Sequence, residues 1–160
     1  RAPERSQISI FVIGILRVFN GRPGMVVVDA LLNQNRLHPE DPYDEYTYLG
    51  ALRSAVKDLR RTNPEIRIVL VTPTYTWYLQ TDQTCEEADN GGGRLEEYVE
   101  AELALARELG VETVDLYHDF FSHEEWEDWA LYTMDGIHPN ETGRDKIAQR
   151  IAQILESEKD

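Results

Sequence analysis

The chain has 160 residues, of which 41% are hydrophobic and 29% are charged, and its formal net charge is −14. This length and composition are typical of one globular domain and argue against a disordered chain. A strong excess of acidic residues is repelled by phosphate backbones and anionic lipid headgroups, so we expect neither a nucleic acid nor a membrane surface as the partner.

The N-terminal half of the chain predicts two strands, a helix and a third strand. The apolar run at residues 8–16 favours a strand, although a buried helix that runs on through Phe19 fits nearly as well, and nine residues are too few to span a bilayer. Residues 25–31 predict a strand that is buried on both faces. Apolar side chains recur at helical spacing over residues 44–62, where an Asn-Pro pair ends the predicted helix. Residues 66–72 form the next predicted strand, which a proline ends.

The C-terminal half begins with a polar and aromatic segment at residues 74–93, long enough to suggest a functional loop. Residues 94–109 predict an amphipathic helix, and the glycine that follows suits its C-terminal cap. A short strand is predicted at 112–116 and a short helix at 123–131. The last predicted helix covers residues 141–156.

Because strands alternate with helices, we predict parallel strand pairing through right-handed crossovers. The predicted fold is a three-layer α/β/α sandwich around a mainly parallel, flavodoxin-like sheet, with residues 1–160 as one domain. Ligands in such sheets bind at the carboxyl ends of the strands. Candidate sites are therefore expected in the segments that follow the strands, at residues 32–38, 73–93 and 117–123, and just before the last helix.

The clearest chemical signal is the sequence Asp135-Gly136-Ile137-His138-Pro139, directly before the last predicted helix. A carboxylate three residues before a histidine in a turn can accept a hydrogen bond from one ring nitrogen. That bond fixes the tautomer and leaves the other nitrogen free as a general base. The same residues also suit a surface turn with a capping aspartate, and the spacing alone leaves both interpretations open.

The wider stretch from Asp135 to Gly143, followed by Lys146-Ile147-Ala148, resembles the C-terminal catalytic block of the SGNH (GDSL-type) hydrolase family. In that family the Asp and His of a D-x-x-H-P turn belong to a Ser-His-Asp triad. Segments at residues 23–28, 63–73 and 110–116 resemble further strands of the family, so the likeness covers roughly residues 23–157. The resemblance implies that Asp135 and His138 are catalytic and that neither a metal nor a cofactor is needed.

The block that supplies the oxyanion donor differs from the family pattern. Where the family has G-x-N-D, this chain reads Leu31-Leu32-Asn33-Gln34. The resemblance implies Asn33 as the side chain that donates to the oxyanion. Asn35 is a competing candidate, and an asparagine that simply turns the chain after a strand is the remaining alternative.

The nucleophile of the family has no counterpart in this sequence. The family carries it in a G-D-S block after the first strand, but Ile15 and Leu16 stand where the Asp and Ser are expected. Ser6, Ser54 and Ser122 do not resemble that block either. Either the N-terminal strand and nucleophile segment are missing from this chain or the protein has lost the activity, and a chain that begins with arginine favours the first alternative.

Three aromatic residues, Tyr75, Trp77 and Tyr78, follow the predicted strand at residues 66–72, on the side where ligands are expected. Aromatic rings there can stack on a sugar or line an acyl pocket, and the resulting prediction is that they bind the substrate. The alternative is that they pack beneath the long loop.

For two further groups, a possible metal cluster and the single cysteine, a structural role is the favoured interpretation. One cluster has side chains of the kind that bind divalent cations: His118, His123 and Asp119, with two nearby glutamates. Such clusters are usually solvated, so we expect no metal. The single cysteine, Cys85, excludes a disulfide within the chain. Two neighbouring glutamates oppose its activation as a nucleophile.

The resemblance thus implies a serine esterase that uses a Ser-His-Asp triad to hydrolyse small carboxylic esters, such as O-acetyl groups on carbohydrate or a lipid ester. The alternatives are a catalytically inactive SGNH-like domain that binds carbohydrate or another ligand, and an unrelated flavodoxin-like binding domain. The expected partner is a small-molecule ester, without nucleic acid or membrane insertion. No signal peptide can be recognised, so we expect a soluble protein, either cytoplasmic or secreted.

Overall fold

The computed structural model describes residues 10–19, 22–30, 36–89, 92–119 and 129–157. Its elements in chain order are β1 (Ile10–Phe19), β2 (Arg22–Ala30), α1 (Tyr48–Thr62), β3 (Arg67–Val71), β4 (Trp77–Tyr78), β5 (Gln83–Thr84), α2 (Leu95–Leu109), β6 (Glu112–Val114), α3 (Leu116–Asp119), α4 (Trp129–Tyr132) and α5 (Glu141–Ser157). In the part of the chain that is described, no helix combines the length and the hydropathy that crossing a membrane requires.

The main sheet has the strand order β1-β2-β3-β6. β2 pairs with β3 and β3 with β6 in parallel, as predicted, so the α/β class with a mainly parallel sheet is confirmed. The exception is β1, which runs antiparallel to β2, with Phe19 opposite Arg22 and Ile10 opposite Ala30; no helix was predicted between these two strands, so parallel pairing was not expected of them. Only two residues separate these strands, far fewer than the crossover that parallel pairing requires.

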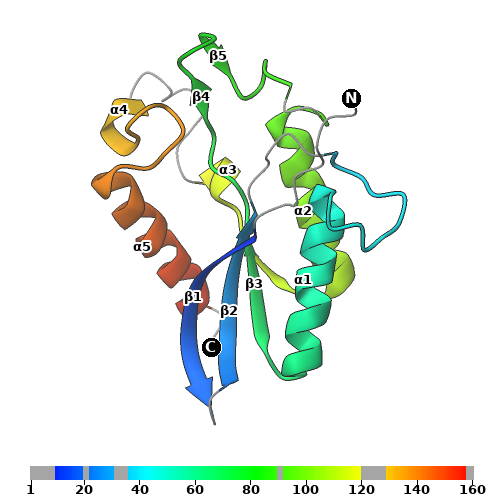
Figure 1. The fold of residues 1–160 in the computed structure, drawn as a ribbon. Coiled ribbons are helices and arrows are strands. Elements are labelled where there is room, and N and C mark those ends of the chain that lie inside the picture. The colour runs from blue at the N-terminus through cyan, green and yellow to red at the C-terminus, as the bar shows by residue number, and fades with distance from the viewer. Residues whose placement is uncertain (1–9, 20–21, 31–35, 90–91, 120–128, 158–160) are drawn as a thin grey trace.

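Helices cover both faces of the sheet, with α1 and α2 on one side and α5 on the other (Figure 1). The alternating side chains of β3 show why both faces must be covered. Ile68 and Leu70 pack in a core cluster with residues of α1 and α2, whereas Val69 and Val71 pack in a second cluster that Ile147 of α5 joins. A strand that is apolar on both faces therefore sits at the centre of three layers.

The helix boundaries follow from local caps. Thr47 caps α1, because its Oγ1 accepts a hydrogen bond from the Gly50 N–H at 3.3 Å, so the helix begins four residues later than predicted. Gly110 ends α2 in the left-handed region, with φ 59°, as its position after the helix predicts. The buried Tyr48 hydroxyl donates to Glu102 at 2.6 Å and ties the two helices together.

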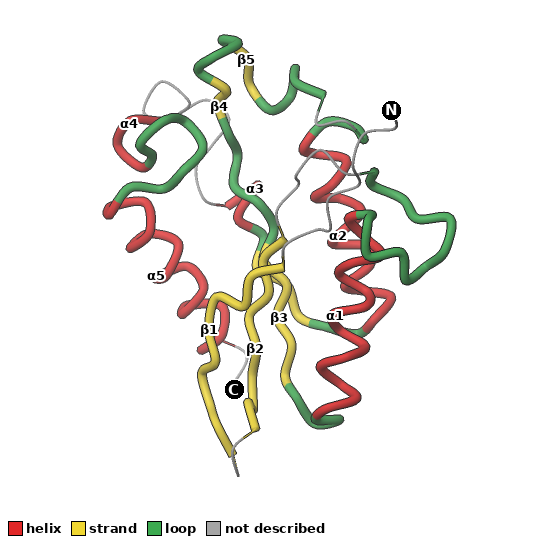
Figure 2. The backbone as a smooth tube through the Cα atoms, viewed as in Figure 1, coloured by secondary structure: helices red, strands yellow, loops and turns green. Residues whose placement is uncertain are grey.

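The segment after β3 is more ordered than a plain loop. β4 and β5 form a small antiparallel hairpin, and Figure 2 shows it standing beyond the carboxyl end of β3. The Cys85 N–H donates to the Thr76 carbonyl at 3.0 Å and closes the base of this hairpin. The hairpin therefore forms a wall at the end of the sheet where ligands are expected.

Candidate active site

The turn that contains Asp135 and His138 lies between α4 and α5 and is closed by backbone pairing. Thr133 and Pro139 form an antiparallel bridge, and the Met134 N–H donates to the His138 carbonyl at 2.8 Å. The Trp77 N–H donates to the Gly136 carbonyl at 2.9 Å. The turn is thus fixed to the segment that leaves β3, at the carboxyl end of the sheet.

The two polar side chains of this turn are hydrogen-bonded to each other. His138 Nδ1 lies 2.7 Å from Asp135 Oδ2, and Asp135 Oδ1 accepts the backbone N–H of His138 at 2.7 Å and that of Ile137 at 3.1 Å. These bonds, the His138 backbone N–H first and its ring second, lower the pKa of Asp135 to about 2. The carboxylate is therefore ionised at neutral pH and can only accept, so Nδ1 must be the donor.

This arrangement leaves the second ring nitrogen of His138 available. No described residue hydrogen-bonds Nε2, and the His138 side chain is 68% exposed. A neutral imidazole that donates from Nδ1 carries its lone pair on Nε2. The pair therefore has the tautomer and the access that a general base requires.

Gly136 is required by the shape of the turn. Its φ of 82° lies in the left-handed region, and a Cβ built on it would lie 2.2 Å from the Trp77 carbonyl oxygen. Its N–H donates to Thr133 Oγ1 at 2.9 Å. Any larger residue would push the turn away from the segment after β3.

Asn140 fixes the other end of the turn. Its Oδ1 accepts the Gly143 N–H at 3.0 Å and so caps α5. Its Nδ2 group lies within hydrogen-bond distance of three carbonyl oxygens of the preceding segment, those of Ala130, Leu131 and Thr133. One side chain thus joins α4, the turn and α5.

A second Asp–His pair follows β6 and was missed as a pair by the sequence analysis. His118 Nδ1 lies 2.7 Å from Asp115 Oδ2, and the His118 N–H donates to Asp115 Oδ1 at 3.1 Å. Thr72 holds this turn, since its Oγ1 accepts the backbone N–H groups of Leu116 at 2.9 Å and Tyr117 at 3.2 Å. The signal in the sequence was the repeated D-x-x-H spacing.

The metal candidate around His118 is not assembled in the described residues. Asp119 is paired with Arg150 of α5 instead. His123 and the two glutamates after it lie outside the described residues. Among the residues that the structure does describe, no three His, Cys, Asp or Glu side chains converge as metal ligands would.

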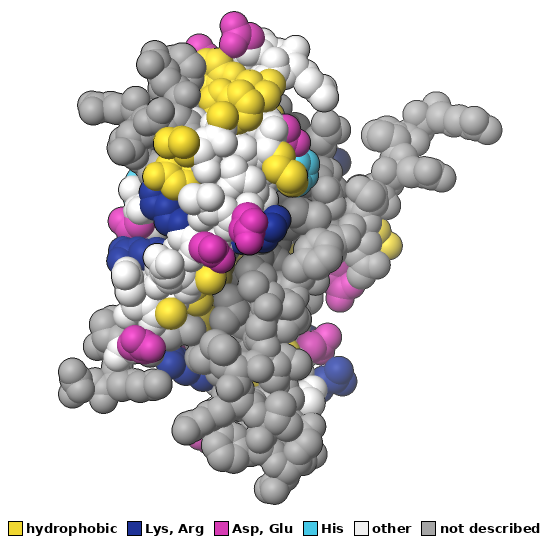
Figure 3. Space-filling view, turned by 90° about the vertical axis from the view of Figure 1, so that its left-hand side faces the viewer, with side chains coloured by type: hydrophobic (Ala, Val, Ile, Leu, Met, Phe, Trp, Pro, Cys, Tyr) yellow, Lys and Arg dark blue, Asp and Glu magenta, His cyan; other side chains and the backbone are white. Residues whose placement is uncertain are grey.

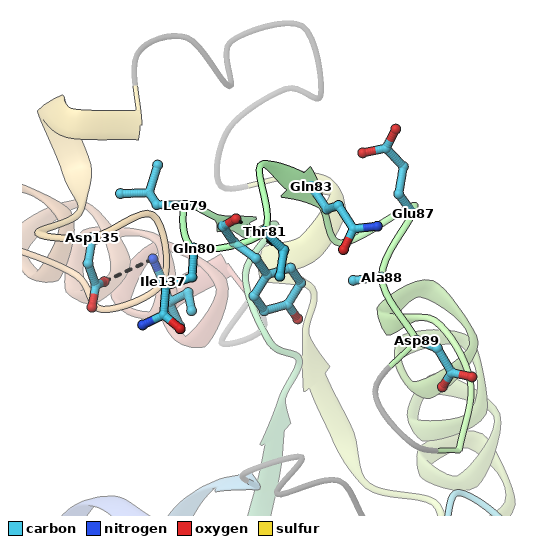
Figure 4. Close-up of a pocket in the computed structure, with 10 residues that line it drawn as sticks. Leu79, Gln80, Thr81, Gln83, Glu87, Ala88, Asp89, Asp135 and Ile137 are labelled. Carbon is cyan, nitrogen blue, oxygen red and sulfur yellow. Dashed lines mark hydrogen bonds between the residues drawn. The ribbon is translucent and has the colours of Figure 1, made fainter.

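A cavity of about 580 Å³ lies beside the Asp135 turn (Figure 4). The turn contributes Asp135 and Ile137 to its wall. The rest of the wall comes from the β4–β5 hairpin and the segment that follows it: Tyr78, Leu79, Gln80, Thr81, Gln83, Glu87, Ala88 and Asp89. The volume is in the range of small-molecule sites.

The three aromatic residues predicted to bind substrate lie in different surroundings. Tyr78 lines the cavity, and Trp77 is half-buried next to it. Tyr75 is only 2% exposed, does not line the cavity, and packs in the core with its ring centre 5.9 Å from that of Tyr117. Burial raises the pKa of Tyr75 to about 12. The structure thus brings Tyr78 to the turn and keeps Tyr75 in the core.

Several other residues that the sequence analysis considered lie outside the described residues. Asn33 and its competitor Asn35 lie outside the described residues, as do Ser6 and Ser122. Ser54 is on α1, where its hydroxyl donates to the Tyr43 carbonyl at 3.3 Å. The oxyanion donor and the nucleophile therefore remain predictions.

Exposed apolar side chains gather around the turn. Four large hydrophobic side chains remain exposed in this region: Leu79, Leu131, Met134 and Ile137. Figure 3 shows hydrophobic side chains collected at the upper end of the face that carries α4 and α5. Apolar surface beside a cavity is a common feature of ligand sites.

A model of the GDSL-like lipase/acylhydrolase family matches residues 17–146. An isoamyl acetate-hydrolyzing esterase 1 homolog of Mus musculus is 26% identical over 133 residues, which cover 80% of this chain and 52% of the mouse protein. A GDSL esterase/lipase of Arabidopsis thaliana is 25% identical over 123 residues, covering 71% of this chain and 49% of the plant protein. The chain thus spans about half the length of the curated relatives it matches.

Solved structures share the fold. A protein from Lactobacillus plantarum has a TM-score of 0.69 at 20% identity, covering 84% of this chain and 67% of that protein. A structure described as a possible lipase from Chitinophaga pinensis has a TM-score of 0.67 at 20% identity, covering 85% of this chain and 73% of that one. These likenesses confirm the α/β architecture.

Proposed function

The chain belongs to the GDSL-like lipase/acylhydrolase family, and from this premise we propose that it is an ester-hydrolase domain working through a Ser-His-Asp triad. In this proposal residues 1–160 form one domain, His138 is the general base, Asp135 orients it and Asn33 donates to the oxyanion. The observation that carries the proposal is the 2.7 Å bond between His138 Nδ1 and Asp135 Oδ2, with Nε2 left open.

The chemistry of this pair is acyl transfer in two steps. His138 Nε2 takes the proton of a serine hydroxyl as the serine oxygen attacks the ester carbonyl, and Asp135 stabilises the imidazolium that forms. The alcohol leaves with the proton from Nε2. Water then attacks the acyl-serine with His138 again as base, and the acid leaves as the serine regains its proton. Donors such as Asn33 and backbone N–H groups would stabilise the oxyanion in both steps.

The serine itself is proposed to come from sequence outside this chain. No serine of the chain stands in a G-D-S block, and Ser54 is bonded within its own neighbourhood on α1. The chain also spans about half the length of its matched relatives. The same missing block supports the second candidate function, an inactive domain that retains the cavity and binds a carbohydrate or another ligand.

The substrate is proposed to be a small carboxylic ester. The cavity has room for a small molecule, and its amide and hydroxyl groups at Gln80, Thr81 and Gln83 suit an acetylated carbohydrate. The exposed apolar residues around the turn suit the acyl chain of a lipid ester instead. The partner is in either case a small molecule.

Hydrolysis of p-nitrophenyl acetate tests the proposal. The assay compares the 160-residue chain with a form extended by whatever residues the gene encodes before Arg1. We expect weak turnover by the short chain, on the order of a thousandfold over water at most, and strong turnover by the extended form.

Matched histidine variants complete the test. In the extended form, His138→Ala should lower kcat/KM by at least about a thousandfold, whereas His118→Ala should change it less than about threefold. Strong turnover that survives His138→Ala contradicts the triad. If the extended form hydrolyses none of a panel of esters, the esterase proposal is contradicted and the binding-domain proposal is favoured.

A further inference from the structure

We propose that the cavity beside the Asp135 turn selects the ester by charge, admitting a neutral or cationic group and rejecting an anionic one. This inference names the substrate class of the proposed catalytic site and therefore rests on the proposed function. It is carried by the cavity and by the character of the side chains that surround it.

Among the described residues that line the cavity, every charged side chain is a carboxylate. Glu87, Asp89 and Asp135 contribute to the wall, and the other lining residues are neutral. The segment from which most of the wall is built, residues 68–93, contains four acidic residues and no Lys, Arg or His. An anion in the cavity would thus meet like charges, with no cation among the described lining residues to offset them.

The carboxylates surround the cavity and are held in place. Figure 4 shows Asp135 on one side of the cavity and Glu87 and Asp89 on the other. Glu87 Oε2 accepts the Thr84 N–H at 3.0 Å, and Asp89 Oδ1 accepts the Gly93 N–H at 3.3 Å. Because backbone groups anchor these side chains, they cannot swing far away when an anion enters.

Neutral and cationic groups find partners in the same cavity. Gln80, Thr81 and Gln83 offer amide and hydroxyl groups for hydrogen bonds. Tyr78 adds an aromatic ring to the lining, and the face of such a ring attracts an alkylammonium group. The lining therefore favours a cation by Coulombic attraction and tolerates a neutral group by hydrogen bonding.

Three alcohols with the same hydroxyethyl group provide a matched probe series. Choline is cationic, 3,3-dimethylbutan-1-ol is neutral, and isethionate is anionic. Each alcohol is titrated into the ¹⁵N-labelled chain and should shift the amide resonances of the hairpin and of Asp89. The affinities derived from these shifts should be highest for choline, intermediate for the neutral alcohol and lowest for isethionate. We expect about a tenfold preference for choline over isethionate at low salt, falling as salt screens the charges.

Variants identify the groups responsible. The double variant Glu87→Gln with Asp89→Asn keeps an acceptor oxygen at both positions and should reduce the preference for choline over isethionate to about threefold or less. The matched control, Asp82→Asn with Glu86→Gln, also removes two charges, but from neighbouring residues that do not line the cavity, and it should leave the preference almost unchanged. Equal binding of choline and isethionate, or a preference that survives the double variant, overturns the inference.

Hydrolysis separates this inference from the proposed function. In an active form of the protein, acetylcholine and 3,3-dimethylbutyl acetate should both be cleaved with a higher kcat/KM than 2-acetoxyethanesulfonate. If the three esters are cleaved with similar kcat/KM whatever the charge of their alcohol group, charge selection is contradicted, while the proposed esterase function still holds. Charge-selective binding in a protein that cleaves no ester contradicts the esterase and supports charge selection by a binding cavity.

Discussion

Asp135 with His138 and Asp115 with His118 are built alike. In each pair the carboxylate lies three residues before the histidine, accepts its backbone N–H and binds its Nδ1 at 2.7 Å. In each, a threonine hydroxyl supports the turn: Thr133 accepts one backbone N–H for the first pair, and Thr72 accepts two for the second. Local sequence alone therefore produces the same hydrogen bonds twice.

The surroundings of the two pairs differ. Asp135 lines the cavity, its side chain is 48% exposed, and that of His138 is 68% exposed. Asp115 and His118 are 25% and 42% exposed, and the His118 ring stands edge-on to the buried ring of Tyr117 at 5.0 Å. Both short turns thus form the same Asp–His bond, and only the pair of Asp135 lies beside the cavity, which is why it is the pair that we propose as catalytic.

The largest expected difference between the pairs is kinetic. In a form of the protein that hydrolyses p-nitrophenyl acetate, Asp135→Asn should lower kcat/KM by about a thousandfold, because an amide can hold His138 in the wrong tautomer. Asp115→Asn should change it less than about threefold. Steady-state rates for both variants make the comparison, and equal losses would show that the pairs are not functionally distinct.

Glycine substitutions test the shape of the first turn. Gly136→Ala should lower the free energy of unfolding by about 3 kcal/mol, because a left-handed φ and a Cβ 2.2 Å from the Trp77 oxygen act together. Gly110 also has a positive φ, but a Cβ added there would meet nothing within 4 Å. Gly110→Ala should therefore lower the free energy of unfolding by only about 1 kcal/mol. Urea denaturation measures both. Similar losses for the two variants would mean that the turn can move away from Trp77.

Threonine variants compare the supports of the two pairs. Thr72→Val leaves two buried backbone N–H groups without this acceptor and Thr133→Val leaves one, and each variant should lower the free energy of unfolding by about 2 kcal/mol. Only Thr133→Val should also reduce kcat/KM, since it frees the Gly136 N–H beside the cavity. A loss of activity in Thr72→Val at an unchanged fold would assign a catalytic role to the second pair.

The smallest expected effect is the pH dependence of stability. Asp135 has a pKa of about 2 in the folded protein, below its ordinary value of 3.8. A carboxyl whose pKa is lowered by folding stabilises the protein above its unfolded pKa, and the contribution is lost as pH falls toward 2. With half of the side chain exposed, we expect about 1 kcal/mol.

The Asp135→Asn variant isolates this contribution. The difference in free energy of unfolding between wild type and Asp135→Asn should be largest above pH 4 and should shrink toward pH 2. Urea denaturation over this range measures it, and a difference that is independent of pH would mean that the carboxylate is not stabilised by its partners.

Periodicity predicted the elements that pack against each other. The strand at 66–72 and the helix at 141–156 were found almost to the residue, because apolar side chains on both faces or along one stripe leave few alternatives. The direction of β1 was not predicted. Asn20-Gly21 between two apolar runs is a hairpin signal that would have predicted it, and the predicted strand at residues 25–31 began three residues later than β2 does.

The candidate site was only partly predictable. The Asp135 and His138 bond depends on residues three apart, so a local motif was sufficient to find it. The cavity depends on the β4–β5 hairpin meeting the turn through the Trp77 and Gly136 backbone bond, which no local pattern encodes. The second pair was available from spacing, but His118 was considered with Asp119 rather than with Asp115.

We propose that His138, and not His118, activates the nucleophile of this family member. A fluorophosphonate probe tests it directly, since the activated serine oxygen bonds to phosphorus as fluoride leaves. With an ester-hydrolysing form of the protein, mass spectrometry should find one labelled serine, with labelling slowed at least about a hundredfold in His138→Ala and unchanged in His118→Ala. Labelling that persists in His138→Ala and is lost in His118→Ala would contradict the account.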